Sequence, residues 1–183
     1  MSTSQRPASR TIAVAAPEQP RSETPIAVTS ATFADGARID SEQAFTGCGG
    51  KNVSPQLSWS GYPAETKSFA ITIFDPDAPT GSGYWHWVVG DIPVRVTSLD
   101  AGAGRDASPG GGKTGINDFG MNAYSGPCPP AGHGPHRYFV TVYALDVPTL
   151  PGLGEKTTGA TLVFLMRGHV LATGWMMGRF ALP

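Results

Sequence analysis

The sequence of 183 residues predicts one mainly β domain, in which antiparallel strands are followed by a C-terminal helix. Three observations support this fold class. Glycine and proline are abundant, with 24 and 17 residues, which favours short strands and many turns over a helix bundle. Several short runs combine β-branched and aromatic residues and end at turn residues. Only one segment, near the C-terminus, has apolar residues at helical spacing.

Five segments have the composition expected of strands. Residues 68–74 are apolar on both faces, so this strand should be central in a sheet, and Asp75-Pro-Asp-Ala-Pro79 should end it because proline cannot donate to a ladder. Asp91-Ile-Pro93 should end the next strand in the same way. In chain order, the expected strands are 26–33, 56–60, 68–74, 84–89 and 137–145.

The remaining segments are a tail, a loop and the helix. Residues 1–24 contain no aromatic residue and are rich in polar residues and proline, so we expect a disordered tail followed by a single domain over residues 25–183. Residues 100–120 are predicted as a long glycine-rich loop, a kind of segment that is often functional or mobile. Ala160 to Gly174 is predicted as an amphipathic helix.

The charge balance argues against two kinds of partner. Thirteen basic and fourteen acidic residues give a net charge of −1 with no long run of either sign, whereas a nucleic-acid surface usually has a basic stripe. Electrostatic binding to a membrane lacks the same signature, and no apolar run is long enough to span a bilayer. We therefore expect neither a nucleic-acid partner nor stable membrane insertion, and no motif indicates a cofactor.

The two cysteines, Cys48 and Cys128, lie eighty residues apart and form no metal-type pair. The simplest interpretation is two reduced thiols in a cytoplasmic protein. A disulfide stays open as an alternative, provided that the two Cα atoms lie within ~7 Å. The early apolar stretch from Thr11 to Ala16 is shorter than that of a signal peptide, which also favours the cytoplasm.

Two polar clusters lie next to predicted strands. Asp75 and Asp77 follow strand 68–74, and residues i and i+2 of an extended segment point the same way, so both carboxylates should face one side. An ordinary Asp-Pro turn explains the same residues. His86 alternates with Trp85 and Trp87 and should face away from both, although a purely structural histidine fits this position as well.

A third cluster is the proline- and glycine-rich stretch 126–138, which places His136 and Tyr138 at the opening of a strand. His133 and His136 lack the helical spacing of a zinc motif, so no metal site is expected. If the three clusters converge, two aspartates and two histidines form a small site that suits a zwitterion. Histidine would donate to a phosphate, and aspartate would accept from an ammonium group.

These motifs, taken in order, resemble those of the phosphatidylethanolamine-binding protein family, also called Raf kinase inhibitor proteins. The resemblance rests on Asp75-Pro-Asp-Ala-Pro-Thr80, His86-Trp87 and Gly134-Pro-His-Arg-Tyr138. Further stretches resemble the bacterial branch of that family: Asn52-Val-Ser-Pro-Gln-Leu-Ser-Trp59, Lys67-Ser-Phe-Ala70, Asn117-Asp-Phe-Gly120 and Gly126-Pro-Cys-Pro-Pro130. The match runs from about residue 26 to the C-terminus, and the ordered set is far more specific than any single motif.

The resemblance implies a β-sandwich in which a large antiparallel sheet packs on a smaller one, with an anion pocket at one end. It also makes Ala78-Pro79 a candidate cis peptide bond. Phe180 departs from the family pattern, because relatives often have tyrosine there, and so does the tail of residues 1–24. The ligand-binding residues carried over by position are Asp75, Asp77, His86, Pro129, Pro130, His136 and Tyr138.

The leading functional hypothesis is a binding protein with a rigid Asp/His/Pro pocket for a small anionic or zwitterionic ligand. Phosphate or a phospholipid headgroup such as phosphoethanolamine would fit, and the protein would modulate a partner protein. No nucleophile elbow or phosphate-binding loop is present. One alternative is an inhibitor of a protease or kinase that acts through residues 100–120. The other is a cyclase, isomerase or hydrolase whose general acids and bases are Asp75, Asp77, His86 and His136.

Overall fold

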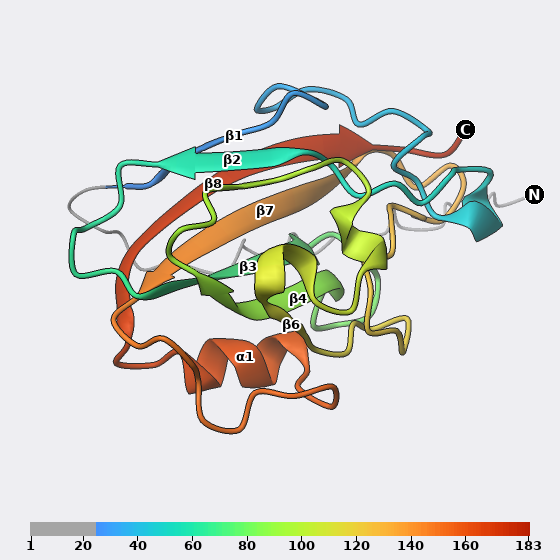
Figure 1. The fold of residues 1–183 in the computed structure, drawn as a ribbon. Coiled ribbons are helices and arrows are strands. Elements are labelled where there is room, and N and C mark those ends of the chain that lie inside the picture. The colour runs from blue at the N-terminus through green and yellow to red at the C-terminus, as the bar shows by residue number, and fades with distance from the viewer. Residues whose placement is uncertain (1–24) are drawn as a thin grey trace, which may run out of the picture.

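The computed structural model describes residues 25–183, so the predicted tail of residues 1–24 lies outside the described residues. Two antiparallel sheets face each other, and one short helix covers the outer face of the larger sheet (Figure 1). The smaller sheet has the strand order β1-β2-β5, with β1 (Ala27–Thr29), β2 (Leu57–Ser60) and β5 (Ser98–Leu99). The larger sheet has the order β6-β4-β3-β7-β8, with β6 (Lys113–Thr114), β4 (Tyr84–Pro93), β3 (Ser68–Asp75), β7 (His136–Leu145) and β8 (Val170–Phe180).

The core has two parts, one on each face of the larger sheet. Between the sheets lie large side chains such as Trp59, Phe69 and Trp87, and on the opposite face Leu162 of helix α1 (Gly159–Leu165) packs with Tyr143. Every residue of β3 is buried, because β4 and β7 flank this strand and both of its faces are covered. The predicted fold class is therefore confirmed: residues 25–183 are mainly β, with a large and a small antiparallel sheet and one α-helix.

The C-terminal helix is much shorter than predicted. It starts after Thr158, whose hydroxyl accepts a hydrogen bond from Thr161 N, and it ends at Leu165. Gly168 then adopts a φ of +85°, which ends the helical turn, and strand β8 follows where the sequence pattern predicted helix up to Gly174. Pairing of β8 along the whole of β7 outweighs the local helical spacing.

Two other boundaries differ from the sequence prediction. The first strand covers only Ala27–Thr29 instead of 26–33. Strand β4 continues through Asp91 to Pro93, where it ends opposite Ser68. Asp91 has a φ of +56°, and its carboxylate accepts a hydrogen bond from Leu150 N at 2.8 Å, so a side-chain contact supports an unusual backbone conformation inside the strand.

Residues 100–120 are not one unsupported loop. They contain two 3₁₀ helices, η2 (Ala103–Arg105) and η3 (Pro109–Gly111), and strand β6, which pairs with β4. The backbone of Gly104 donates to the hydroxyl of Ser54 at 2.8 Å, which fixes this segment on the domain.

Two further expectations are wrong. Cys48 and Cys128 form a disulfide with a Cα–Cα distance of 5.6 Å, so the interpretation as two reduced thiols is wrong and the alternative left open from the sequence is correct. A hydrogen bond of 3.0 Å from Phe45 N to Pro127 O brings their loops together. The described residues also contain no cis peptide bond, so the bond between residues 78 and 79 is trans.

Candidate functional site

A cavity of about 250 Å³ opens at one end of the larger sheet, where β3 ends and where β4 and β7 begin. Antiparallel neighbours bring these three strand ends together, which explains why motifs far apart in the sequence meet here. Six of the seven predicted binding residues line this cavity, namely Asp75, His86, Pro129, Pro130, His136 and Tyr138. Asp77 does not. The lining residues outside that predicted set are Ala78, Pro79, Thr80, Tyr84, Phe119 and Cys128.

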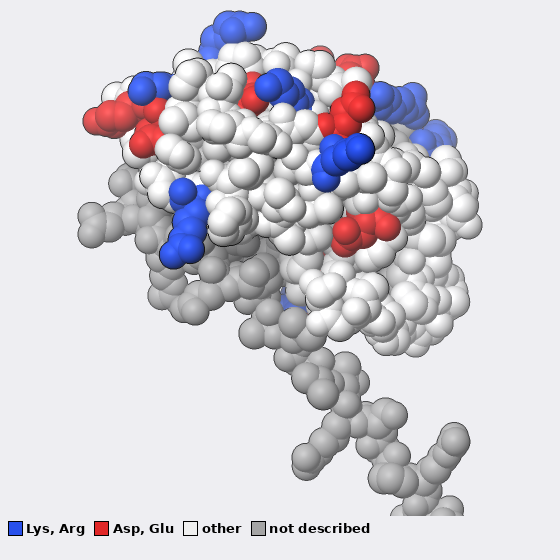
Figure 2. All heavy atoms as spheres, turned by 90° about the horizontal axis from the view of Figure 1, so that it is seen from below, with Lys and Arg blue, Asp and Glu red and all other residues white. Residues whose placement is uncertain are grey.

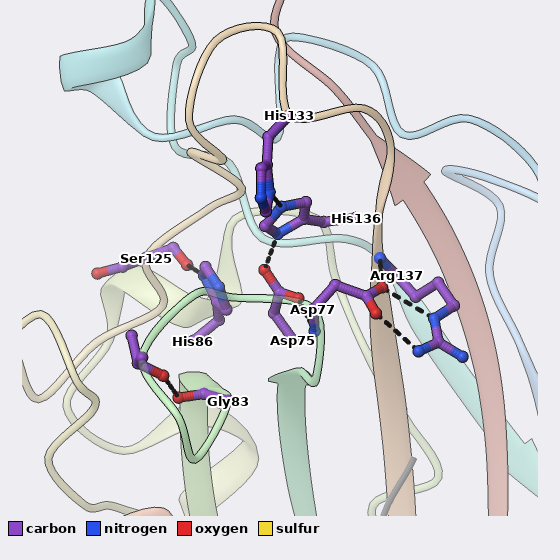
Figure 3. Close-up of polar contacts among 9 residues, drawn as sticks. Asp75, Asp77, Gly83, His86, Ser125, His133, His136 and Arg137 are labelled. Atoms are coloured by element: carbon purple, nitrogen blue, oxygen red, sulfur yellow. Dashed lines mark hydrogen bonds and ion pairs between the residues drawn. The ribbon is translucent and has the colours of Figure 1, made fainter. Parts of the chain in front are cut away.

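Asp75, His136 and His133 form a chain of hydrogen bonds that leads from the cavity to the surface (Figure 3). His136 Nδ1 lies 2.7 Å from Asp75 Oδ2, and His136 Nε2 lies 2.7 Å from His133 Nδ1. Asp75 and His136 are each 2% exposed, whereas His133 is exposed. Because a carboxylate only accepts, His136 Nδ1 donates to Asp75, and one hydrogen lies between the two histidines. The chain therefore links a buried carboxylate to solvent.

Asp77 points away from Asp75 (Figure 3). Asp75 Oδ1 accepts a hydrogen bond from Asp77 N at 2.8 Å, so the segment forms a turn, and the expectation that both carboxylates face one side is wrong. The Asp77 carboxylate instead accepts from Arg137 Nε at 2.8 Å and from a terminal guanidinium nitrogen at 2.7 Å. These bonds lower the pKa of Asp77 although partial burial opposes the shift. Asp77 thus fastens the end of β3 to β7.

A β-bulge places His86 in the cavity. Strand β3 pairs Ile73 with Trp87 and the next residue, Phe74, with Trp85, so His86 is the extra residue of β4. As a result, Trp87 packs between the sheets and Trp85 packs on the side of α1. The two tryptophans lie on opposite faces, so the expectation that His86 faces away from both is wrong.

The state of the His86 ring follows from its contacts. Nδ1 lies 2.7 Å from the carbonyl oxygen of Ser125, and a carbonyl only accepts, so Nδ1 has the hydrogen. Burial lowers the pKa of His86, which keeps the ring neutral near pH 7. The other ring nitrogen, Nε2, is then a lone-pair acceptor. Asn117 donates to Ser125 Oγ at 2.9 Å and so helps to hold this carbonyl in place.

Tyr138 supplies an unused donor at the wall of the cavity. Its side chain is 1% exposed, and its hydroxyl has no hydrogen-bond partner among the described residues. Burial and the neighbouring Asp75 carboxylate raise the pKa of Tyr138, so the hydroxyl keeps its hydrogen at ordinary pH. The aromatic ring packs edge-on against His86 at a centroid distance of 5.1 Å. A buried hydroxyl without a partner is suited to a ligand that accepts.

The prolines form a stiff wall that is tied down at both ends. The disulfide joins Cys128 to the end of 3₁₀ helix η1 (Thr46–Cys48), and Pro130 O accepts from His133 N at 3.1 Å. Phe119 closes another side, with its ring centroid 5.6 Å from that of His86. Phe119 was not among the predicted binding residues, although it belongs to the motif Asn117-Asp-Phe-Gly120, which could have indicated its place at the pocket. Cys128 could have been predicted as a lining residue only if its disulfide with Cys48 had been known.

The described part of the chain contains no group of three or more His, Cys, Asp or Glu side chains placed to hold a metal ion. Within residues 25–183, no helix is both long enough and apolar enough to cross a membrane. On the face shown in Figure 2, basic and acidic side chains are interspersed, and the described part of that face has no basic stripe.

Comparison with known proteins identifies close relatives. The family model described as phosphatidylethanolamine-binding protein matches residues 29–181. The UPF0098 protein YbcL of Escherichia coli is 44% identical over 151 residues, which covers 80% of this chain and 82% of that protein. The UPF0098 protein YbhB of the same organism is 42% identical over 151 residues, covering 80% of this chain and 94% of its own length.

Solved structures agree with the sequence matches. The crystal structure of E. coli YbcL, described as a member of the mammalian PEBP family, superposes with a TM-score of 0.82 at 40% identity, covering 86% of this chain and 99% of that one. The structure of the PEBP homologue CT736 from Chlamydia trachomatis gives a TM-score of 0.74 at 34% identity, covering 87% of this chain and 99% of that one.

Proposed function

This chain belongs to the phosphatidylethanolamine-binding protein family, and from this premise we propose that it binds a small anionic or zwitterionic phosphate ester in the cavity at the end of the larger sheet. The single observation that supports the proposal best is the convergence of Asp75, His86, His136 and Tyr138 on one cavity. These side chains come from three different strands, and each is nearly fully buried. Buried polar groups at a concave site are the usual mark of a ligand-binding pocket.

The size and charge of the cavity favour a ligand of headgroup size. A volume of about 250 Å³ lies just below the range of roughly 300–1,000 Å³ that is common for ligand pockets. A phosphate ester with a short amine would place its ammonium group near the Asp75 carboxylate, and its phosphate oxygens could accept from Tyr138. The proline wall restricts movement, which reduces the entropy lost on binding.

Isothermal titration with O-phosphoethanolamine tests the proposal. We expect saturable binding to the wild type and at least about a tenfold loss of affinity in Asp75→Asn, which removes the buried negative charge, and in His136→Ala, which removes the ring bonded to it. Asp146→Asn is a matched control, because Asp146 forms a similar pair of 2.9 Å with His169 but lies on the surface. Absence of binding to the folded wild type, or equal binding by all variants, would contradict the proposal.

An enzyme is the second candidate, and the hydrogen-bonded chain through Asp75, His136 and His133 favours it. A buried carboxylate linked to solvent through two histidines could exchange protons with a bound substrate, as general acid–base catalysis requires. The test is a turnover assay on phosphate monoesters and small esters that bind. A rate that His136→Ala removes would support catalysis, and a ligand that binds but is never converted would count against it.

The inhibitor hypothesis has less support. This hypothesis assigns inhibition to residues 100–120 and not to the pocket, yet Phe119 from this segment lines the cavity and Gly104 is bonded to Ser54. A surface that acts separately from the pocket would therefore have to be confined to η2 and η3. That this protein modulates a partner protein is likewise only a proposal.

The disulfide bears on the cellular compartment. The cytoplasmic location expected from the sequence stays a prediction, whereas a bridge between Cys48 and Cys128 favours an oxidising compartment, because cytosolic thiols are kept reduced. A thiol count under denaturing conditions on protein isolated from its native cells distinguishes the two. Two free thiols would support the cytoplasm, and none would support an oxidising compartment.

A further inference from the structure

The contact between His133 and His136 bears on how a ligand reaches the pocket, and this inference rests on the function proposed above. We propose that His133 competes with the ligand, because its ring occupies the position at His136 Nε2 that a polar group of the ligand takes in the complex. The His133 side chain turns out into solvent when the ligand binds. His133 is not one of the residues that line the cavity, so it acts by covering His136 and not by holding the ligand.

His136 has both of its ring nitrogens engaged by the protein. The ring lies between Asp75 and His133 (Figure 3), with Nδ1 2.7 Å from Asp75 Oδ2 and Nε2 2.7 Å from His133 Nδ1. Each ring nitrogen has either one hydrogen or one lone pair to offer, so each is used up by one hydrogen bond. His136 lines the cavity, yet it can bond to a ligand only after one of these two partners has left.

Most other polar side chains of the cavity wall also lie against protein groups. These contacts are Thr80 with Gly83 O, Tyr84 with Asp118 O, His86 with the backbone of Ser125 and Gly126, and Tyr138 with the Asp75 carboxylate. In each of them the partner is a backbone group or a buried carboxylate, which has little freedom to move. The partner of His136 Nε2 is instead an exposed side chain. Among these contacts, the one with His133 is therefore the easiest for a ligand to replace.

The surroundings of His133 leave its side chain free to rotate. Asp75 is 2% exposed and cannot withdraw, whereas His133 is exposed and stands between Gly132 and Gly134. A Cβ added to either glycine would have nothing within 4 Å, so this segment is surrounded by open space. The backbone is held in place, since His133 N donates to Pro130 O at 3.1 Å. Rotation of the ring into solvent thus opens His136 Nε2 while the proline wall stays in position.

The competition does not depend on which nitrogen holds the hydrogen shared by the two histidines. If His136 Nε2 has it, a phosphate oxygen of the ligand accepts this hydrogen, and the ring then donates to a carboxylate on one side and to a phosphate on the other. If Nε2 has a lone pair, an ammonium group of the ligand donates to it. Either contact requires the position that His133 occupies.

Isothermal titration of O-phosphoethanolamine into His133→Ala tests this inference. The variant lacks the hydrogen bond that the ligand must break in the wild type, so we expect about three- to tenfold tighter binding. His169→Ala is the matched control, because His169 also bonds to a side chain, Asp146, at 2.9 Å but does not line the cavity, and its affinity should equal that of the wild type. In a His136→Ala background, His133→Ala should change nothing, because the group that His133 covers is gone.

Equal or weaker binding by His133→Ala than by the wild type would overturn the inference. The same gain of affinity in the His136→Ala background would also overturn it, because His133 would then act on something other than His136. Both results require binding by the wild type, so they leave the proposed function standing. Absence of binding to the folded wild type would contradict the proposed function itself, and the inference with it.

Discussion

Removal of the disulfide should destabilise the domain without changing its fold. Cys48 and Cys128 are 80 residues apart, and closing a loop of this length in the unfolded chain corresponds to about 4.5 kcal/mol at 25 °C when only chain entropy is considered. The hydrogen bond of 3.0 Å from Phe45 N to Pro127 O joins the same two loops and does not depend on either sulfur atom, so it should persist without the bridge. We therefore expect the native geometry to survive and the free energy of unfolding to fall by about 2–4.5 kcal/mol.

Equilibrium unfolding in urea of the double variant Cys48→Ala/Cys128→Ala measures this loss. With a slope of about 2 kcal/mol per molar urea, the midpoint should fall by about 1–2 M. Wild-type protein in excess reductant is the control, because it loses the bridge without a change of sequence and should show the same shift. Unchanged midpoints in both samples would refute the reasoning. Cys128 also lines the cavity, so the variant should bind O-phosphoethanolamine more weakly.

Three further predictions concern charge and packing, and urea unfolding reports each of them. Asp77→Asn should cost about 1 kcal/mol at pH 7, because Asp77 is only partly buried. Arg137 lowers the pKa of Asp77 in the folded protein, so this stabilisation is present above the unfolded-state pKa of 3.8 and is lost as the pH falls through the lower folded-state pKa. If Asp77→Asn lowered the free energy of unfolding by the same amount at about pH 3 as at pH 7, the reasoning would be wrong. Burial lowers the pKa of His86, so between about pH 7 and 5 the unfolded state takes up a proton that the folded state does not. Over this range the free energy of unfolding should therefore fall more in the wild type than in His86→Gln. Gly159→Ala would place a Cβ 2.1 Å from Trp85 Cδ2 and should cost about 1–3 kcal/mol, and an unchanged midpoint would show that the ring moves freely.

Much of the architecture was predictable because it depends on local pattern. The continuous apolar run 68–74 predicted a central strand, and every residue of β3 is buried. Asp75-Pro-Asp77 indicated the end of one strand, and the proline-rich stretch before His136 indicated the start of another. Antiparallel pairing brings that end and that start to the same edge of the sheet. For that reason, residues chosen from separate motifs line one cavity.

The failures share a physical cause, since each depends on contacts between distant segments. The bulge at His86 appears only in the pairing of β3 with β4, and it places Trp85 and Trp87 on opposite faces. Asp77 turns toward Arg137, sixty residues away in the sequence. The residues after Gly168 have helical spacing in isolation, but the exposed edge of β7 converts them into strand β8. Local patterns contain no information on such pairings.

The most direct test of the central claim is a map of backbone amide shifts by NMR while O-phosphoethanolamine is added. Binding in the cavity predicts the largest shifts at the residues that surround it, including Tyr84, His86, Phe119, His136 and Tyr138, with little change on helix α1 at the far face of the larger sheet. Shifts concentrated on α1 or on η2 and η3, with the cavity residues unchanged, would contradict the assignment of this cavity as the binding site.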